Sequence, residues 1–501
     1  MDRRTLLKTG AALGLASAAP RYVLAAGTTA GPSGGGALTD LAAVRGDRSP
    51  IVIGADSLRN LRASLRGRLL LAADPGYDEA RQVLNGAIDR RPALIVQPTG
   101  AADVSTAVSF AGSLGLLVAV KCGGHSFSGQ STCDGGLQID LSGMRGVRVD
   151  PTARRAWVAG GTLLGAVDHE VLALGLAAPL GTVSHTGVGG LTTGGGFGRL
   201  ARRFGLALDN VTSVDLVTAD GRLRRASADE NPDLYWAVRG GGGNFGVVTA
   251  FEFQLHPVQR QMIGGMLVFP IDRARELLKR YAEVSLSAPD ELYVDCFIAY
   301  PAKGAPACGF DICWSGAASE AERVLAPLRK VGKPILDRVA STDYAALQRS
   351  GDVSDPRAQG SYTKSGFTTA ISDSTIDAIL RGLEPDATRS STVYFQHAGG
   401  AIGRVAPEST AFPFRYAMQN MMIFSDWNAR EDGTGPVAWA REYWKTLEPA
   451  TRGVYINEMD AADGAAAVNA NFLQNYPRLA SLKRRYDPAN LFRMNANITP
   501  T

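Results

Sequence analysis

The chain has 501 residues, of which 45% are apolar and 20% charged, and its formal net charge is +4. This length allows two or three domains with a substantial core, and the composition excludes a disordered or membrane-embedded protein. The first 26 residues carry +3 of the net charge, so the rest is nearly neutral and nothing favours nucleic acid as a partner.

Five cysteines occur, at positions that fit neither a CxxC motif nor a metal-ligand spacing: Cys122, Cys133, Cys296, Cys308 and Cys313. We therefore expect no metal cofactor. An odd number leaves at least one cysteine unpaired within the chain. Cys308 and Cys313 are close enough in sequence for a disulfide in an oxidising compartment, and two ordinary buried thiols are an equal alternative.

Residues 1–26 resemble a twin-arginine export signal, with Arg3-Arg4 before a short apolar stretch and small residues at its end. Cleavage after Ala18, Ala25 or Ala26 would fit, and the mature protein would be periplasmic or secreted. Residues 27–56 are rich in Gly, Ser, Thr and Ala, which predicts a flexible linker. We expect folded structure from Ser57.

Residues 57–257 form the first predicted domain, which contains a β-α-β unit between Pro92 and Gly146 and two hairpins, at Asp150-Pro151 and around Asp220. Three glycine-rich turns interrupt it, at residues 121–129, 181–198 and 240–243. Glycines let main-chain N–H groups approach a pyrophosphate closely. The first turn also holds His125, whose imidazole on a rigid turn suits a nucleophile toward an activated methyl group, which suggests a tethered flavin.

Residues 258–450 have a different hydrophobic pattern from the first domain. Alternating patterns typical of strands are interleaved with helical patterns such as 272–284 and 319–331. This order predicts a second domain, an antiparallel sheet with helices on one face. Residues 451–501 predict a helix-rich tail with a final strand-like end.

Seven segments in order carry a family resemblance: GGHSFSG, STCDGGLQIDLS, GTVSHTGVGGLTTGGGFG, RGGGGNFGVVTAFEF, AFPFR, VYINEMD and NYPRLASLKRRYDPANLF. Together they resemble FAD-linked oxidoreductases of the berberine-bridge-enzyme type, over nearly the whole chain after Ser57. The resemblance implies an α+β protein with the PCMH-type flavin-binding fold of vanillyl-alcohol oxidase. The FAD domain would have two parts, residues 57–257 and 451–501, with residues 258–450 inserted as the substrate domain.

By this resemblance FAD is bonded to His125 through the 8-methyl group of its ring. Many members have a second bond from a cysteine in the other glycine loop, but Val183 stands there, so a single bond is expected. The residues expected to hold the cofactor are Gly123, Gly124, Ser126 and Gly129 of the first loop, Thr182, Thr186, Gly187, Gly189, Gly190, Gly194, Gly195 and Gly196 of the second, and Val248 and Asn495.

Oxidation of an alcohol or amine carbon needs a base for the heteroatom's proton while the flavin accepts hydride. The family often places a tyrosine of a Y-x-N motif over the ring, and Tyr455-Ile-Asn457 matches it. Tyr455 is the first candidate, provided that a nearby Arg or Lys favours its phenolate, and a core tyrosine is the alternative. Glu458 is the second candidate, although on a strand it should point away from the face that Asn457 lines.

The substrate is expected to meet Gln396 or His397, which alternate on one strand so that only one faces the ligand, and Met422, which stands where plant relatives carry Glu or Gln. Because Met422 is less polar than Glu or Gln, this side of the expected substrate pocket favours an apolar or aromatic substrate over a bare sugar. His185 is expected to bond within its loop or to face the flavin, and His169 and His256 are expected to be structural.

The leading hypothesis is therefore an exported flavoenzyme that oxidises a small alcohol, sugar or hydroxylated aromatic or alkaloid and passes electrons to O2 or another acceptor. The rival is a flavin-bearing carrier without turnover. Retention of His125 and of the glycine loops favours the enzyme.

Overall fold

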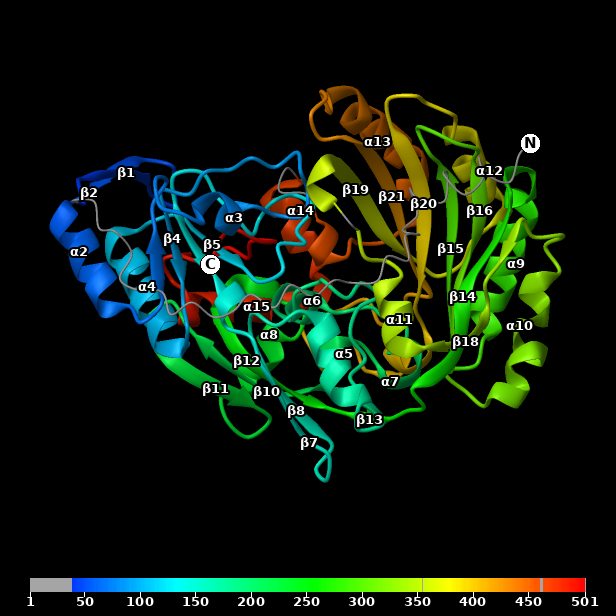
Figure 1. Cartoon of the computed structure of the whole chain (residues 1–501), viewed down its shortest axis with the longest axis horizontal. Helices are drawn as coiled ribbons and strands as arrows, with labels where there is room; N and C mark the ends of the chain where they lie inside the picture. The colour runs from blue at the N-terminus through cyan, green and yellow to red at the C-terminus, as the bar shows by residue number, and fades with distance from the viewer. Residues whose placement is uncertain (1–37, 354, 460–462, 501) are drawn as a thin grey trace.

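A computed structural model describes residues 38–353, 355–459 and 463–500, and these residues form two lobes that meet along one side (Figure 1). The first lobe contains the amino-terminal half of the chain and the carboxyl-terminal helices. The second contains one large sheet. The predicted export signal and residues 27–37 of the predicted linker lie outside the described residues.

The amino-terminal end of the first lobe corrects one prediction. Residues 41–53 are not a flexible linker but an antiparallel hairpin, β1 (Leu41–Val44) with β2 (Pro50–Ile53), followed by α2 (Ala55–Ser64). Ala43 and Ile53 are buried in the same cluster as Leu94 of the neighbouring sheet. Folded structure thus begins before Ser57, because even these short strands supply apolar side chains to the core.

The predicted β-α-β unit is confirmed. It forms a four-stranded sheet in the order β3 (Arg68–Leu70), β4 (Leu94–Gln97), β6 (Leu137–Asp140) and β5 (Val118–Lys121), with β4 and β5 parallel to β6. The unit's helix is α4 (Ala101–Leu114), and the short α3 (Tyr77–Arg81) lies beside β4. The Asp103 carboxylate accepts hydrogen bonds from the main chain and hydroxyl of Thr99, which fixes the start of α4. Strand β5 runs directly into the first glycine loop.

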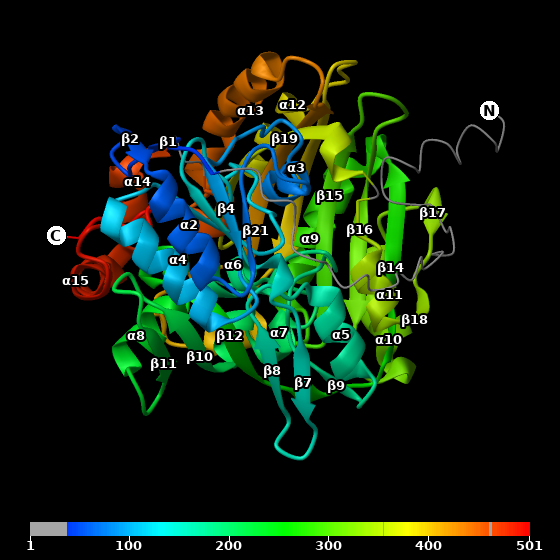
Figure 2. The same ribbon diagram turned by 60° about the vertical axis from the view of Figure 1, so that its left-hand side comes forward.

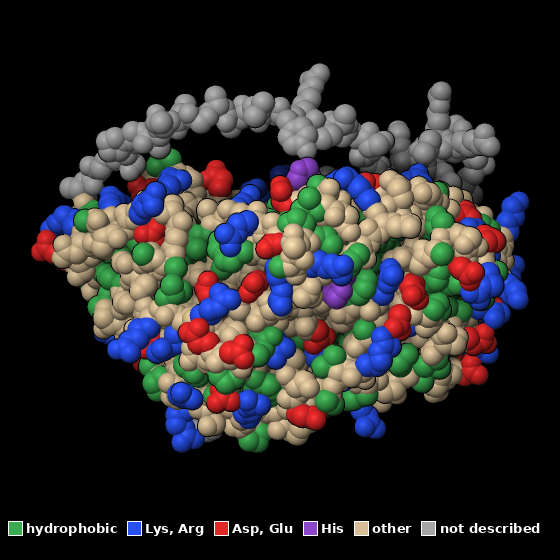
Figure 3. All heavy atoms as spheres, turned by 90° about the horizontal axis from the view of Figure 1, so that it is seen from below, with side chains coloured by type: hydrophobic (Ala, Val, Ile, Leu, Met, Phe, Trp, Pro, Cys, Tyr) green, Lys and Arg blue, Asp and Glu red, His purple; other side chains and the backbone are tan. Residues whose placement is uncertain are grey.

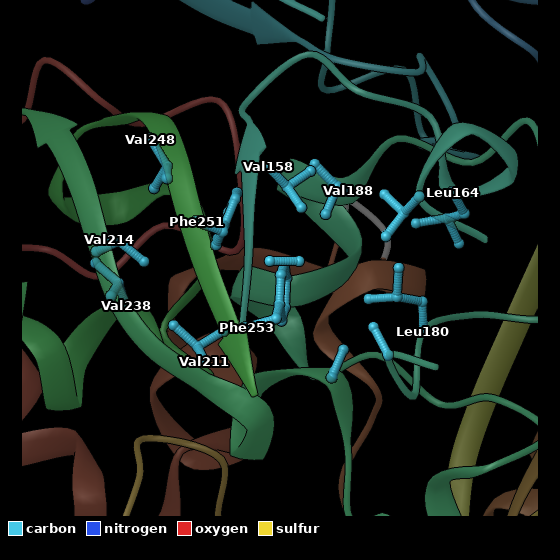
Figure 4. Close-up of a cluster of buried hydrophobic side chains, with 14 of the residues drawn as sticks. Val158, Leu164, Leu180, Val188, Val211, Val214, Val238, Val248, Phe251 and Phe253 are labelled. Carbon is cyan, nitrogen blue, oxygen red and sulfur yellow. The ribbon is translucent and has the colours of Figure 1, made fainter. Parts of the chain in front are cut away.

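A five-stranded antiparallel sheet follows, in the order β11 (Leu223–Ser227), β10 (Val211–Val217), β12 (Val247–Gln254), β8 (Arg155–Ala159) and β7 (Val147–Asp150). Both predicted hairpins are present in it. Its inner side chains, including Val158, Val214 and Phe251, pack with residues from helices and loops of the same lobe (Figure 4). The shorter elements here are α5 (Leu164–Leu172), β9 (Leu176–Ala177), α6 (Val188–Gly194), α7 (Ala201–Phe204), α8 (Pro232–Val238) and β13 (His256–Pro257).

The second lobe is an eight-stranded antiparallel sheet with four helices on one face, as predicted (Figures 1 and 2). The strands are β17 (Leu336–Asp337), β14 (Gln261–Pro270), β16 (Ala307–Trp314), β15 (Leu292–Tyr300), β20 (Ser390–His397), β21 (Gln419–Asn428) and β19 (Gln359–Thr368) in spatial order, with β18 (Ala340–Asp343) also pairing with β14. The four helices are α9 (Ala274–Ser287), α10 (Ala321–Arg329), α12 (Asp373–Gly382) and α13 (Thr434–Leu447). The opposite face is left free to meet the first lobe.

Two helices of the tail, α14 (Gly464–Asn471) and α15 (Tyr476–Tyr486), return to the first lobe, where Leu479 and Leu482 share a buried cluster with Phe251. The chain then continues to residue 500 without the expected strand. Instead, the buried Asp487 carboxylate accepts hydrogen bonds from the main-chain N–H groups of Leu491 and Phe492 and from the Lys483 ammonium. Hydrogen bonds to this side chain, and not those of a β-ladder, therefore hold this segment in place.

The surface in Figure 3 carries Lys and Arg interspersed with Asp and Glu, without a large area of one sign. This agrees with the nearly neutral charge of the chain beyond its first 26 residues. Among the described residues, no helix combines the length and the apolar character that crossing a bilayer requires.

Candidate active site

A cavity of about 490 Å³ lies between the two lobes, a volume typical of small-molecule sites. Its first-lobe wall is made by all three predicted glycine-rich turns and by the end of the chain at Phe492 to Ala496. Its second-lobe wall is the free face of β20 and β21, and residues 455–458 close one side. Segments far apart in the sequence therefore meet around one space.

The first two glycine loops pack main chain against main chain. A Cβ on Gly123 would lie 2.4 Å from the nitrogen of Gly187, and a Cβ on Gly187 would lie 2.3 Å from the nitrogen of Gly123. Such distances exclude any side chain at either position. The glycines thus bring two rows of main-chain N–H groups to the edge of the cavity, where they can bind an anionic or hydrogen-bonding ligand.

Most of the residues expected to hold a cofactor line this cavity: Gly123, Gly124, His125, Ser126, Thr182, Thr186, Gly187, Gly189, Gly190, Val248 and Asn495. Ser131 and Asn495 each present a buried oxygen that has no hydrogen-bond partner among the described residues. Buried polar atoms normally have partners, so these oxygens fit a ligand that carries donors. The glycine cradle and these oxygens both fit FAD.

Four glycines expected at the cofactor are placed elsewhere, which corrects the prediction. Gly129 has φ +72° and closes the first loop by donating its N–H to the Ser126 carbonyl. Gly194, Gly195 and Gly196 lie outside the cavity, because their main chain makes room for the side chains of residues 455 and 457 and of Ala207. The third predicted turn, residues 240–243, contributes Gly242 and Gly243 to the cavity, and Gly246 just beyond it lines the cavity as well.

His125 is held in a short chain of hydrogen bonds. Its Nε2 lies 2.6 Å from Nδ1 of His185, and its Nδ1 lies 3.4 Å from the Thr186 hydroxyl. Burial, reinforced by the neighbouring His185, lowers the pKa of His125 to about 3. The imidazole is therefore neutral at physiological pH, as a nitrogen nucleophile must be. His185 was expected to bond within its own loop or to face the flavin, and its ring instead contacts His125 of the first loop.

The five cysteines are all free thiols, and Cys308 and Cys313 lie buried on the single strand β16 without a disulfide between them. Cys122 lines the cavity beside Gly187, and burial raises its pKa to about 11, so it is not a ready nucleophile. Val183, which stands where the family resemblance would place a second linking cysteine, lines the cavity. No group of three or more possible metal ligands occurs in the described parts of the chain.

Tyr455 lies at the cavity with its phenol oxygen already engaged. It accepts hydrogen bonds from the Gly196 N–H at 2.9 Å and from the Asn457 amide at 2.8 Å, while its ring packs edge-on against Phe197. Burial raises the pKa of this phenol well above its ordinary value of about 10, and the nearby Glu458 adds to the shift. Among the described residues, the main contributors to this pKa include no Lys or Arg, so the expected phenolate is not favoured.

Glu458 lines the same cavity as Asn457, which corrects the expectation that it points away. The reason is local: residues Ile456–Glu458 form a 3₁₀ turn, not a strand, so alternation does not apply. Its carboxylate accepts a hydrogen bond from the Asn420 amide at 3.2 Å, and burial raises its pKa to about 7. It is a carboxyl group poised to exchange a proton near neutral pH.

The strand alternation decides between Gln396 and His397. Gln396 faces the cavity, whereas His397 is fully buried on the helix side of β20, where its ring contacts the Ser285 carbonyl of α9 at 3.0 Å. Of these two alternatives, Gln396 therefore reaches the cavity and His397 does not. Met422 lines the cavity, as do Tyr394 and Phe424, which were missed. Period two along β20 and β21 would have found both.

Comparison with known proteins agrees with this geometry. Residues 92–227 match the family described as FAD binding domain, and residues 454–499 match the family described as berberine and berberine like. An FAD-linked oxidoreductase of Dictyostelium discoideum is 32% identical over 434 residues, covering 85% of this chain and 93% of the relative. The (R)-6-hydroxynicotine oxidase of Paenarthrobacter nicotinovorans is 31% identical over 458 residues, covering 87% of this chain and 97% of the relative.

Among solved structures, 6-hydroxy-D-nicotine oxidase of Arthrobacter nicotinovorans superimposes with a TM-score of 0.80 at 29% identity, covering 87% of this chain and 99% of the other. The expected α+β architecture with a PCMH-type FAD-binding fold is thereby confirmed. The chain belongs to the berberine-bridge-enzyme-like family of FAD-linked oxidoreductases.

Proposed function

We propose that the protein is an exported FAD-dependent oxidoreductase that takes a hydride from a small organic substrate onto a flavin tethered by a single bond to His125. The observation that carries this proposal is the cavity itself. One part of it holds the glycine cradle and His125, and another holds the Glu458 carboxyl group beside the apolar wall of β20 and β21. Bound FAD supplies hydride acceptance, and a bond to the protein prevents its loss and can raise its reduction potential.

Glu458 is the group that takes the proton from the substrate's O–H or N–H. Its pKa of about 7 leaves a large carboxylate fraction at neutral pH, and Asn420 orients it by donating a hydrogen bond. Tyr455 is a weaker candidate, since its phenol has a raised pKa and already accepts two hydrogen bonds. Through their side chains, Tyr455 and Asn457 instead hold the turn of residues 455–458 against the end of the second glycine loop.

The cavity wall supports a substrate with an aromatic or apolar body. Phe127, Phe424 and Met422 offer apolar surface, while Tyr394 and Gln396 offer a few polar atoms. This balance suits a hydroxylated aromatic or heteroaromatic alcohol or amine better than an oligosaccharide, whose many hydroxyls need many partners. The similarity to (R)-6-hydroxynicotine oxidase points the same way.

The neutral imidazole of His125 among the glycines supports the single tether, and Val183 removes the thiol that a second bond would need. His125→Ala should leave no flavin attached to the protein after acid precipitation, whereas the wild type should remain yellow. The basic and apolar residues 1–26 support export to the periplasm or beyond.

Anaerobic mixing with candidate substrates tests the function. Hydroxylated aromatics and cyclic amines should bleach the flavin, and readmitted O2 or an artificial acceptor should restore its colour. If alcohols, amines and sugars all leave the colour unchanged, the rival function, a flavin-bearing carrier, takes its place.

A further inference from the structure

Tyr394, which lines the cavity on β20, directs the proton of its phenol to a buried carboxylate. Its O–H donates a hydrogen bond to Oδ2 of Asp295 at 2.5 Å. Asp295 is fully buried on the neighbouring strand β15, where it also accepts hydrogen bonds from the Tyr293 hydroxyl at 2.8 Å and from the His397 N–H at 3.0 Å. Three donors therefore converge on one carboxylate, as suits a group that accepts hydrogen bonds and donates none.

Tyr394 is left with one polar function toward the cavity. Burial and the neighbouring Asp295 raise the pKa of its phenol well above the ordinary value, so the proton stays on the phenol oxygen. Because that proton points to Asp295, the oxygen can only accept a hydrogen bond from a ligand. Tyr394 thus calls for a ligand that carries an O–H or N–H group.

Gln396, two residues further along β20, presents the opposite function. The Asn420 amide nitrogen donates to a carboxylate oxygen of Glu458 at 3.2 Å and to the amide oxygen of Gln396 at 3.1 Å. Since a carboxylate only accepts, Asn420 must turn its N–H2 group to Glu458, and the Gln396 atom that meets the same nitrogen must be its oxygen. The N–H2 group of Gln396 is then the part of its amide that can donate to a ligand.

The acceptor and the donor lie close enough to act on one group. Tyr394 and Gln396 share the cavity face of β20, and alternate residues of a strand are about 6.6 Å apart. One oxygen atom with two hydrogen bonds of about 2.8 Å each nearly spans this separation. An ammonium group has no acceptor for Gln396 and an ether has no donor for Tyr394, so a hydroxyl group is the simplest single group that satisfies both.

We propose that Tyr394 and Gln396 determine specificity by binding a hydroxyl group on the aromatic ring of the substrate, and that Asp295 is a positioning residue for Tyr394. The inference rests on the proposed function, because it specifies the substrate class of the same cavity. This hydroxyl group is distinct from the reacting group, whose proton goes to Glu458. Apolar surface for the ring comes from Met422, which pairs with Tyr394 across the sheet.

Binding of three probes to the full-length, flavin-containing protein tests the inference by isothermal titration calorimetry. Burial raises the pKa of Asp295 to about 7, so titration at about pH 8 keeps it mostly ionised. The probes are para-chlorophenol, para-chloroanisole, which keeps the oxygen but has no O–H, and para-chlorotoluene, which has neither. The wild type should bind the phenol at least about tenfold more tightly than the anisole, because the anisole leaves the Tyr394 oxygen without a donor.

Each variant should give its own pattern. Tyr394→Phe should weaken binding of the phenol about tenfold and change that of the anisole by less than about twofold. Gln396→Leu should weaken the phenol and the anisole alike, since both offer an oxygen to the lost N–H2 group. Asp295→Asn has one acceptor oxygen in place of two, so the preference for the phenol should fall below about threefold. Tyr416→Phe, at an exposed position outside the cavity, should match the wild type.

The outcomes separate the inference from the proposed function. A wild type that binds the phenol and the anisole equally, or a Tyr394→Phe protein that keeps the preference, overturns the inference. An unchanged preference in Asp295→Asn overturns the positioning role. If the binding pattern is found but no hydroxylated aromatic bleaches the flavin, the recognition is supported and the proposed oxidation is contradicted. If hydroxylated aromatics are oxidised and Tyr394→Phe leaves their KM unchanged, the oxidation is supported and the inference is overturned.

Discussion

Replacement of Glu458 by Gln removes the proposed base while keeping its shape and an oxygen for the Asn420 amide. The wild-type carboxyl group has a pKa of about 7, so about half of it is ionised at pH 7 and about 1% at pH 5. Because the base acts as carboxylate, flavin reduction by substrate should fall on the acid side, by about fiftyfold between pH 7 and pH 5. Glu458→Gln should be slower at pH 7 by about a hundredfold or more and should lose this pH dependence.

The assay is anaerobic stopped-flow bleaching of the flavin at a series of pH values, with Glu448→Gln as the matched control. Glu448 is exposed at the end of α13 and should give the wild-type profile. A Glu458→Gln protein that reduces its flavin at the wild-type rate, or that keeps the fall below pH 7, would refute the assignment of the base.

Three further predictions follow from the site and the export signal. Gly123→Ala should bind at least about tenfold less FAD, because its Cβ would clash with the Gly187 nitrogen, whereas Gly146→Ala, with open space around the new atom, should bind it normally; equal yellow colour in both would contradict the cradle. Tyr455→Phe should slow flavin reduction by less than about tenfold, since only hydrogen bonds to Gly196 and Asn457 are lost, and a hundredfold loss would return the role of base to this tyrosine. Lysines in place of Arg3 and Arg4 should retain the protein in the cytoplasm on cell fractionation, and normal export would indicate another route.

The sequence predicted the elements that depend on local signals. Hairpin turns, the β-α-β unit and the helix-covered antiparallel sheet all follow from periodicity and turn residues, and each is present. The hairpin of residues 41–53 was missed because its strands have only four residues each and lie in a Gly- and Ala-rich stretch. Its burial depends on contacts with a sheet formed much later in the chain.

Within the site, the sequence predicted which residues take part better than it predicted the directions in which their side chains point. Gln396 and His397 alternate on β20, and only the packing of α9 on one face of the sheet decides which of them reaches the cavity. Glu458 was expected to face away because a strand was assumed where a 3₁₀ turn occurs. Gly194 and Gly195 looked like part of a cofactor loop, but their space is taken by the side chains of Asn457 and Tyr455, about 260 residues away in the sequence, which no local pattern signals.

The tether at His125 is tested most directly by mass spectrometry of the purified protein after proteolysis in acid. The account predicts that the peptide containing His125 carries the mass of FAD, and that fragmentation places this mass on the histidine side chain. An unmodified His125 peptide from protein that is yellow when native, or FAD found on another residue, would contradict it.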